Sequence, residues 1–195
     1  MKSLRISLLF LMLNFVFTNL ALAQAYNLAP DSSTQITVTG TSTLHGWTVT
    51  AKEVQDVPTQ LTFSDSMTVD SFSFGVVVNS MDGGRGASMN KKITGALKAV
   101  EQPIITFEQK EIAIVSPIDA TGNFTLTSRG ILKMAGLEKE VEIEVAGQKI
   151  ANGIILKGSK PLTFSQFEIE PPSAMFGQIV CGDDIAVNFD FRYEK

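Results

Sequence analysis

The chain has 195 residues with 16 basic and 20 acidic side chains, a net charge of −4 and 44% hydrophobic residues. This length suits one domain with a substantial core, and the acidic balance without a basic stripe argues against nucleic acid as a partner. The one cysteine, Cys181, excludes an internal disulfide, so we expect the core alone to hold the fold.

Residues 1–23 have the pattern of a secretory signal peptide. Lys2 and Arg5 precede an apolar run that is too short and too interrupted for a membrane span, and Ala21-Leu22-Ala23 is a small-x-small cleavage signature. We expect cleavage after Ala23 and a periplasmic or secreted protein with no membrane span. Because Gln24 and not Cys would follow the cut, no lipid anchor is expected.

Alternation of apolar and polar residues dominates the rest of the chain, and this period of two is typical of strands with one dry face and one wet face. Turn residues separate about eight such stretches, which favours an antiparallel sandwich or barrel. The apolar rows, in chain order, are Ile36 and Val38; Trp47, Val49 and Ala51; Phe72, Phe74, Val76 and Val78; Ile112 and Ile114; Phe124 and Leu126; Val141, Ile143 and Val145; Ile154 and Leu156; and Ile185, Val187, Phe189 and Phe191.

The segment EKEVEIEV is the clearest of these strands. Its glutamates at positions 138, 140, 142 and 144 share one face and its valines and isoleucine the other. A carboxylate-covered face cannot lie under the helices of a parallel sheet, so this strand favours an antiparallel fold.

Two segments depart from the alternation. After a glycine-rich loop, Met89, Ile93, Leu97 and Val100 follow helical spacing, which predicts a short helix near residues 89–100 that ends before Pro103. Pro171-Pro172 prevents a regular element later in the chain. Since no linker interrupts the pattern, we expect residues 24–195 to form one domain.

The chain offers few groups for catalysis. His45 is its only histidine, and the sequence contains no nucleophile elbow and no clustered zinc ligands. Asp183-Asp184 reads as a solvated turn, and GGRGASMN lacks the spacing of a phosphate-binding loop. We therefore expect a protein that is not an enzyme, with no catalytic residues, no metal and no cofactor.

Apolar bulk is in excess, with 13 Phe and 7 Met in the chain. Several lie in the irregular segments, and Met recurs at surfaces that accept variable apolar ligands. Ordinary core filling explains the same composition. An eight-stranded barrel would be either plugged by its side chains or able to hold one small ligand.

Four stretches resemble the YceI-like family of lipid- and polyisoprenoid-binding proteins. They are SSTQITVTGTSTLHGWTVTA, SMDGGRGASMNKKITGALKAVEQPIITFEQ, GNFTLTSRGILKMAGLEKEVEIEV and PLTFSQFEIEPPSAMFGQIVCGDDIAVNFDF, and together they cover most of residues 26–192. Leu132-Lys133-Met134 and Cys181 depart from the usual pattern of the family.

The resemblance implies a lipocalin-like, extended eight-stranded antiparallel β-barrel whose lumen takes an isoprenoid or another long-chain lipid for carriage, storage or sequestration. We expect its lining among Trp47, Phe72, Phe74, Phe107, Leu126, Phe164, Phe167, Met175 and Phe176, and polar groups of the mouth among His45, Arg85, Asn90 and Lys92.

Two alternatives remain at this point. A filled barrel would make the protein a structural or interaction module, and His45 with a partner could make it a hydrolase of an apolar or glycosidic substrate. A strand edge or a helix face could also support a homodimer.

Overall fold

The computed structural model describes residues 24–29, 34–55, 61–63, 73–116 and 118–194. Residues 1–23, where we expect a signal peptide, and Phe72 lie outside these ranges. The elements are β1 (Gln24–Leu28), β2 (Gln35–Ser42), β3 (Gly46–Ala51), β4 (Val54–Gln55), β5 (Leu61–Phe63), β6 (Ser73–Val77), η1 (Val78–Ser80), β7 (Met81–Asp82), α1 (Ala87–Ala96), β8 (Ile104–Val115), β9 (Asn123–Met134), β10 (Leu137–Ile150), β11 (Gly153–Thr163), η2 (Ser165–Phe167), β12 (Ser173–Ala174) and β13 (Ile179–Glu194).

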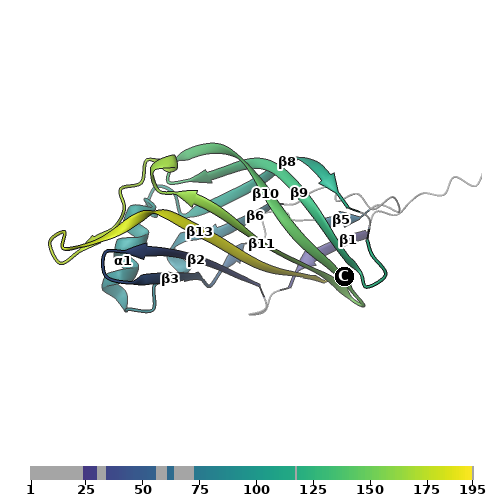
Figure 1. Cartoon of the computed structure of the whole chain (residues 1–195), viewed down its shortest axis with the longest axis horizontal. Helices are drawn as coiled ribbons and strands as arrows, with labels where there is room; N and C mark the ends of the chain where they lie inside the picture. The colour runs from purple at the N-terminus through teal and green to yellow at the C-terminus, as the bar shows by residue number, and fades with distance from the viewer. Residues whose placement is uncertain (1–23, 30–33, 56–60, 64–72, 117, 195) are drawn as a thin grey trace, which may run out of the picture.

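The strands form one antiparallel sheet that curls into an elongated barrel (Figure 1). β8, β9, β10 and β11 are paired in succession, and β13, β2 and β3 continue the order. β1 pairs with β13 and β5 at the end that carries the C-terminus. The all-β, lipocalin-like fold expected from the sequence is confirmed.

Two short strand pairs connect the ends of this order. β3 pairs with β7 and β4 with β6, while β6 also pairs with β8. Between these pairs the Lys52 amide donates to the Ser80 carbonyl at 3.3 Å and the Val77 amide to the Glu53 carbonyl at 3.1 Å. If β3–β4 and β6–β7 each count as one segment, the ring consists of eight strand segments.

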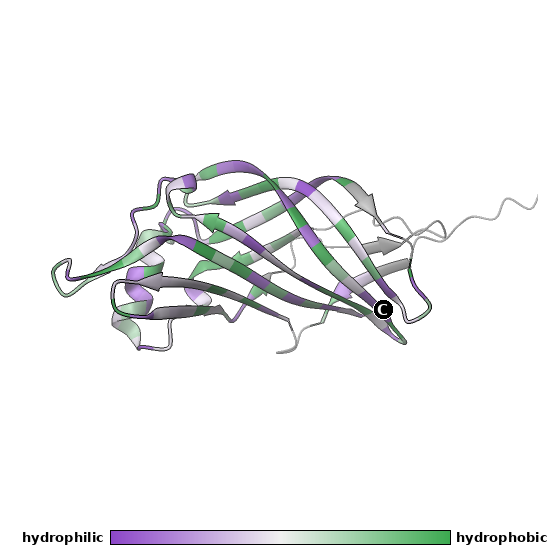
Figure 2. Ribbon diagram, in the orientation of Figure 1, coloured by the Kyte–Doolittle hydropathy of each residue, from purple (hydrophilic) through white to green (hydrophobic). Residues whose placement is uncertain are grey.

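The alternation predicted from the sequence sets the inner and outer faces of the long strands (Figure 2). In β9 every even-numbered residue from Phe124 to Met134 is buried, and the odd-numbered residues between them are more exposed. The row of glutamates at 138, 140, 142 and 144 is exposed on β10, as predicted. Arg129 bridges Glu111 and Glu142 on this outer face, at 3.0 and 2.7 Å.

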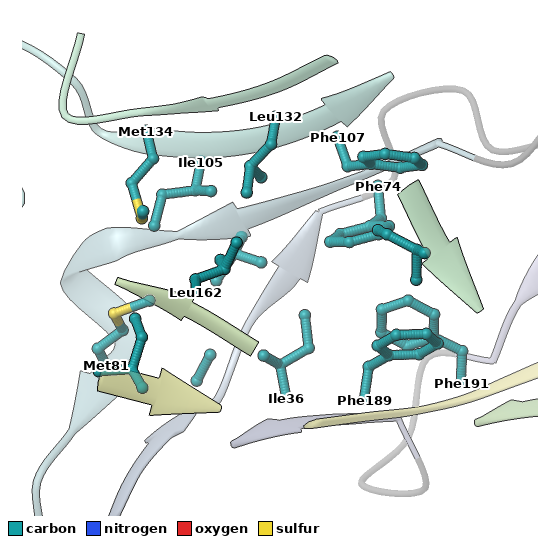
Figure 3. Close-up of a cluster of buried hydrophobic side chains, with 14 of the residues drawn as sticks. Ile36, Phe74, Met81, Ile105, Phe107, Leu132, Met134, Leu162, Phe189 and Phe191 are labelled. Atoms are coloured by element: carbon teal, nitrogen blue, oxygen red, sulfur yellow. The ribbon is translucent and has the colours of Figure 1, made fainter. Parts of the chain in front are cut away.

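A cluster of aromatic rings fills part of the barrel interior (Figure 3). Phe74 lies with its ring centroid 5.5 Å from that of Phe107 and 5.0 Å from that of Phe191, and Phe189 lies 5.2 Å from Phe191. Gly158 makes room for one of them, since a Cβ there would lie 2.2 Å from the Phe189 ring. A larger residue in place of Gly158 on β11 would therefore collide with the Phe189 ring.

The helix is shorter than the sequence predicted. α1 ends at Ala96 because the next turn is a Schellman motif: Lys98 is left-handed with φ 55°, and the Ala99 amide donates to the Thr94 carbonyl. Leu97 is buried, whereas Val100, which the helical spacing had included in the helix, lies beyond α1 and is 92% exposed. β8 begins directly after Pro103, as predicted.

Candidate functional site

A cavity of about 570 Å³ lies in the half of the barrel next to α1. Its wall is mostly apolar and comes from both the strands and the helix, and Figure 3 shows part of it. The apolar lining comprises Ile36, Val38, Leu44, Trp47, Val49, Phe74, Val76, Met81, Met89, Ile93, Ala96, Leu97, Ile105, Leu132, Met134, Ile143, Leu162, Phe164, Pro172, Ala174, Ile179, Cys181, Ile185, Val187 and Phe189.

The aromatic cluster limits the depth of the cavity. Phe74 and Phe189 belong to the lining, while Phe107 and Phe191 behind them are fully buried and do not. Beyond these rings the barrel is filled by side chains such as Leu156 and Tyr193. The barrel therefore has one half that is packed with side chains and contributes stability, and another half with a cavity that could hold a ligand.

Trp47 stands in the wall with its polar atom satisfied. Its indole Nε1 donates to the Thr41 carbonyl at 2.9 Å, and its ring lies 6.3 Å from that of Phe164 in a stacked arrangement. Gly40, opposite on β2, permits this position, since a Cβ there would lie 2.3 Å from the indole. Because this hydrogen bond satisfies the indole N–H, Trp47 needs no polar partner from a ligand in the cavity.

A bulge in β13 holds Phe164 against Trp47. The register of β13 with β2 shifts between Cys181 and Ile185, and Asp183 in this bulge accepts hydrogen bonds from the Ser165 amide at 2.8 Å and hydroxyl at 2.6 Å. These bonds lower the pKa of Asp183. They fix the start of η2, and Phe164 is its N-terminal flanking residue.

The mouth of the cavity carries the polar side chains. His45, Arg85, Lys92 and Lys160 contribute to the lining, and Lys92 donates to the Ser173 carbonyl. His45 closes the turn between β2 and β3, where its amide donates to the Ser42 hydroxyl at 3.2 Å and its Nδ1 lies 2.6 Å from the Gly46 carbonyl oxygen.

Asp82 and Asn90 brace the glycine-rich loop at the mouth. The Asn90 side-chain oxygen accepts from the Gly83 amide at 3.0 Å, and Asp82 accepts from the Gly84 amide at 2.9 Å. Lys52 contacts Asp82 at 2.7 Å, and the Asn90 side-chain amide donates to Asp82 at 3.3 Å. The contact with Lys52 and the hydrogen bonds from the Gly84 amide and from Asn90 together lower the pKa of Asp82 to about 2. Asn90 thus orders the loop but does not itself line the cavity.

Comparison with known proteins identifies the fold. No family model matches the sequence, and no curated protein matches it. Solved structures do match, among them that of Burkholderia cenocepacia BcnA, with 16% identity over 82% of this chain and 95% of that one at a TM-score of 0.63. A polyisoprenoid binding domain from Saccharophagus degradans implicated in plant cell wall breakdown has 13% identity over 87% of this chain and 97% of that one, at a TM-score of 0.62.

A third match is the YCEI protein of Campylobacter jejuni, with 17% identity over 75% of this chain and 84% of that one at a TM-score of 0.58. The fold is YceI-like. The structural likeness shows the fold that the sequence motifs led us to expect.

Within the YceI-like barrel, the described residues that were predicted as lining occupy three different positions. Trp47, Phe74 and Phe164 stand in the cavity wall. Phe107, Leu126 and Phe167 are buried but outside the cavity lining. Met175 and Phe176 are 63% and 110% exposed at the tip of the loop between β12 and β13, and Phe72 is not among the described residues. Of the four polar residues, His45, Arg85 and Lys92 lie at the mouth and Asn90 behind it.

Sequence reasoning missed most of the aliphatic wall. Ile36, Ile105, Leu132, Met134 and Leu162 line the cavity. Of these, only Ile36 stood in a predicted apolar row, and that row was not assigned to a cavity. Since Leu126 in the packed half also stood in such a row, alternation identifies an interior residue without saying whether it faces a cavity.

Among the described residues, the polar side chains that line the cavity are Ser42, His45, Thr48, Arg85, Lys92, Lys160 and Ser173. Among the residues that the structure describes, no group of three or more His, Cys, Asp or Glu could hold a metal ion. Within the same residues, no helix is long and apolar enough to cross a membrane. Cys181 lines the cavity, and burial raises the pKa of its thiol while the charge of Lys92 partly opposes that shift.

Proposed function

We propose that this protein binds an apolar chain, a polyisoprenoid or another long-chain lipid, in the cavity next to α1 and carries, stores or sequesters it without catalysis. The observation that carries the proposal is the mostly apolar cavity of about 570 Å³, a volume in the range of small-molecule sites. A polyisoprenoid binding domain with the same fold supports it.

Burial of the chain would supply the affinity. Each buried CH₂ group contributes about 0.8 kcal/mol, so about ten buried groups contribute about 8 kcal/mol before the cost of ordering the ligand. Without that cost, this free energy corresponds to a dissociation constant of about 1 μM. Arg85, Lys92 and Lys160 at the mouth would contact a polar or anionic head group.

We also propose that the protein is exported and functions after removal of residues 1–23. The sequence of this segment supports the proposal, with Lys2, Arg5, an apolar run and Ala21-Leu22-Ala23. Mass spectrometry of the protein from the periplasm or the medium should give a chain that begins at Gln24, and a cytoplasmic chain of full length would contradict it.

The test of binding is extraction of the purified protein, prepared without detergent, followed by lipid mass spectrometry. A prenyl or acyl chain should co-purify, and the delipidated protein should take up an added prenol. If neither occurs with a folded protein, the binding proposal is wrong and the alternative of a filled barrel is favoured.

A further inference from the structure

The loop between β12 and β13 displays two large apolar side chains to solvent. Met175 is 63% exposed and Phe176 is 110% exposed, and Figure 1 shows this loop extending past the barrel at the α1 end. Such exposure opposes the hydrophobic effect, and exposed apolar patches mark surfaces that contact other molecules.

The backbone holds the tip in this outward position. Met175, Phe176 and Gly177 are consecutively left-handed, with φ of 49°, 53° and 85°, a conformation unfavourable for residues with side chains. The Gly177 amide donates to the Ala174 carbonyl at 3.1 Å and the Gln178 amide to the Met175 carbonyl at 3.2 Å. Thr43 braces the base of the loop through its amide, which donates to the Val180 carbonyl at 3.0 Å.

The charge around the tip differs from that of the whole chain. Residues 42–47, 83–98 and 171–181 all contribute to the cavity lining, and their sequences contain Arg85, Lys91, Lys92 and Lys98 but no Asp or Glu. Of the carboxylates that border these segments, Asp82 is paired with Lys52 and Asp183 is bonded to Ser165. Glu101 follows the second segment and is exposed, and Glu170 and Asp184 border the third segment at its base. The chain as a whole carries a net charge of −4.

We propose that the Met175–Phe176 tip and the cations of the α1 segment dock this end of the barrel on an anionic lipid surface. Apolar side chains flanked by Lys and Arg are the combination that binds such a surface. Because the net charge is negative, an anionic bilayer repels the barrel as a whole and attracts only this end. The mouth of the cavity then faces the lipid, so an apolar chain can pass between bilayer and cavity with little exposure to water. This use of docking rests on the proposed function, but docking itself does not.

Co-sedimentation with vesicles of phosphatidylglycerol and phosphatidylethanolamine, against vesicles of phosphatidylcholine alone, tests the proposal. The wild type should bind the anionic vesicles more strongly, and added salt should weaken the binding. Phe176→Ser should lower the partition coefficient about tenfold, whereas Phe176→Leu should keep most of it. Lys91→Glu should lower it about tenfold. Lys149→Glu should leave it unchanged, because Lys149 pairs with Ile154, which pairs with Tyr193 near the C-terminus, at the end of the barrel away from α1 (Figure 1).

Thermal unfolding checks that each variant is folded, and prenol binding without vesicles separates the two proposals. A wild type that binds prenol but ignores anionic vesicles would overturn docking and leave the proposed function intact. Vesicle binding without prenol binding would do the reverse. Equal vesicle binding by the Phe176→Ser and Phe176→Leu variants, or tip-dependent self-association without vesicle binding, would also overturn docking.

Discussion

Ala96 offers the sharpest way to fill the cavity without touching the strands. It lies in the last turn of α1, is half-buried and belongs to the lining. In Ala96→Phe the added phenyl ring enters the space that the ligand would occupy, because Ala96 lines the cavity.

The expected loss follows from the volume that the ring takes. A phenyl ring displaces about four methylene groups of a bound chain, and at about 0.8 kcal/mol each the cost is about 3 kcal/mol. This free energy corresponds to a roughly 100-fold weaker dissociation constant. Ala87→Phe on the same helix is the matched control, since Ala87 is exposed and outside the lining, and its affinity should equal that of the wild type.

The assay is a titration of delipidated protein with a fluorescent prenol, and thermal unfolding verifies that both variants are folded. If Ala96→Phe binds as tightly as Ala87→Phe, the chain does not occupy this cavity and the reasoning is refuted.

Three further predictions concern the core, the loop and the thiol. Phe107→Ala should destabilise the protein by about 3–5 kcal/mol, because Phe107 is fully buried against Phe74; a loss below about 1 kcal/mol in denaturant unfolding would contradict a packed half. The pKa of Asp82 is lowered from 3.8 to about 2, so its contribution to stability is complete above about pH 4 and is lost as the pH falls toward 2. The melting temperature of Asp82→Asn should therefore lie below that of the wild type at pH 6 and converge with it near pH 2, and a constant difference would show that the ionised carboxylate is not the cause. Bound ligand should slow the reaction of Cys181 with a thiol reagent, since Cys181 lines the cavity; equal rates with and without saturating prenol would place the ligand elsewhere.

The sequence predicted much of the fold because alternation responds directly to burial. The row of glutamates on β10 and the buried valines and isoleucine between them follow from one period of two, and the other long strands repeat the pattern. The end of α1 was less predictable. The left-handed conformation at Lys98 that turns the chain there occupies a position where glycine is usual, and nothing in the local composition indicates it.

The cavity could be predicted only in part. Trp47, Phe74 and Phe164 stand in the cavity wall, but Phe107 and Leu126 were predicted as lining together with them and lie outside it. Which rings stack across the barrel depends on pairings between distant strands, such as Phe74 opposite Phe107. Met175 and Phe176 were predicted to line the lumen because they are large and apolar. The left-handed turn instead directs them into solvent.

The most direct test of the cavity uses Trp47, the only tryptophan of the chain, which stands in the cavity wall. A brominated long-chain lipid quenches tryptophan fluorescence on contact. Bound in the cavity, it should quench the Trp47 emission in a saturable manner, and an unlabelled prenol should reverse the quenching. If the brominated chain binds the protein and the Trp47 emission is unchanged, the cavity next to α1 does not hold the chain.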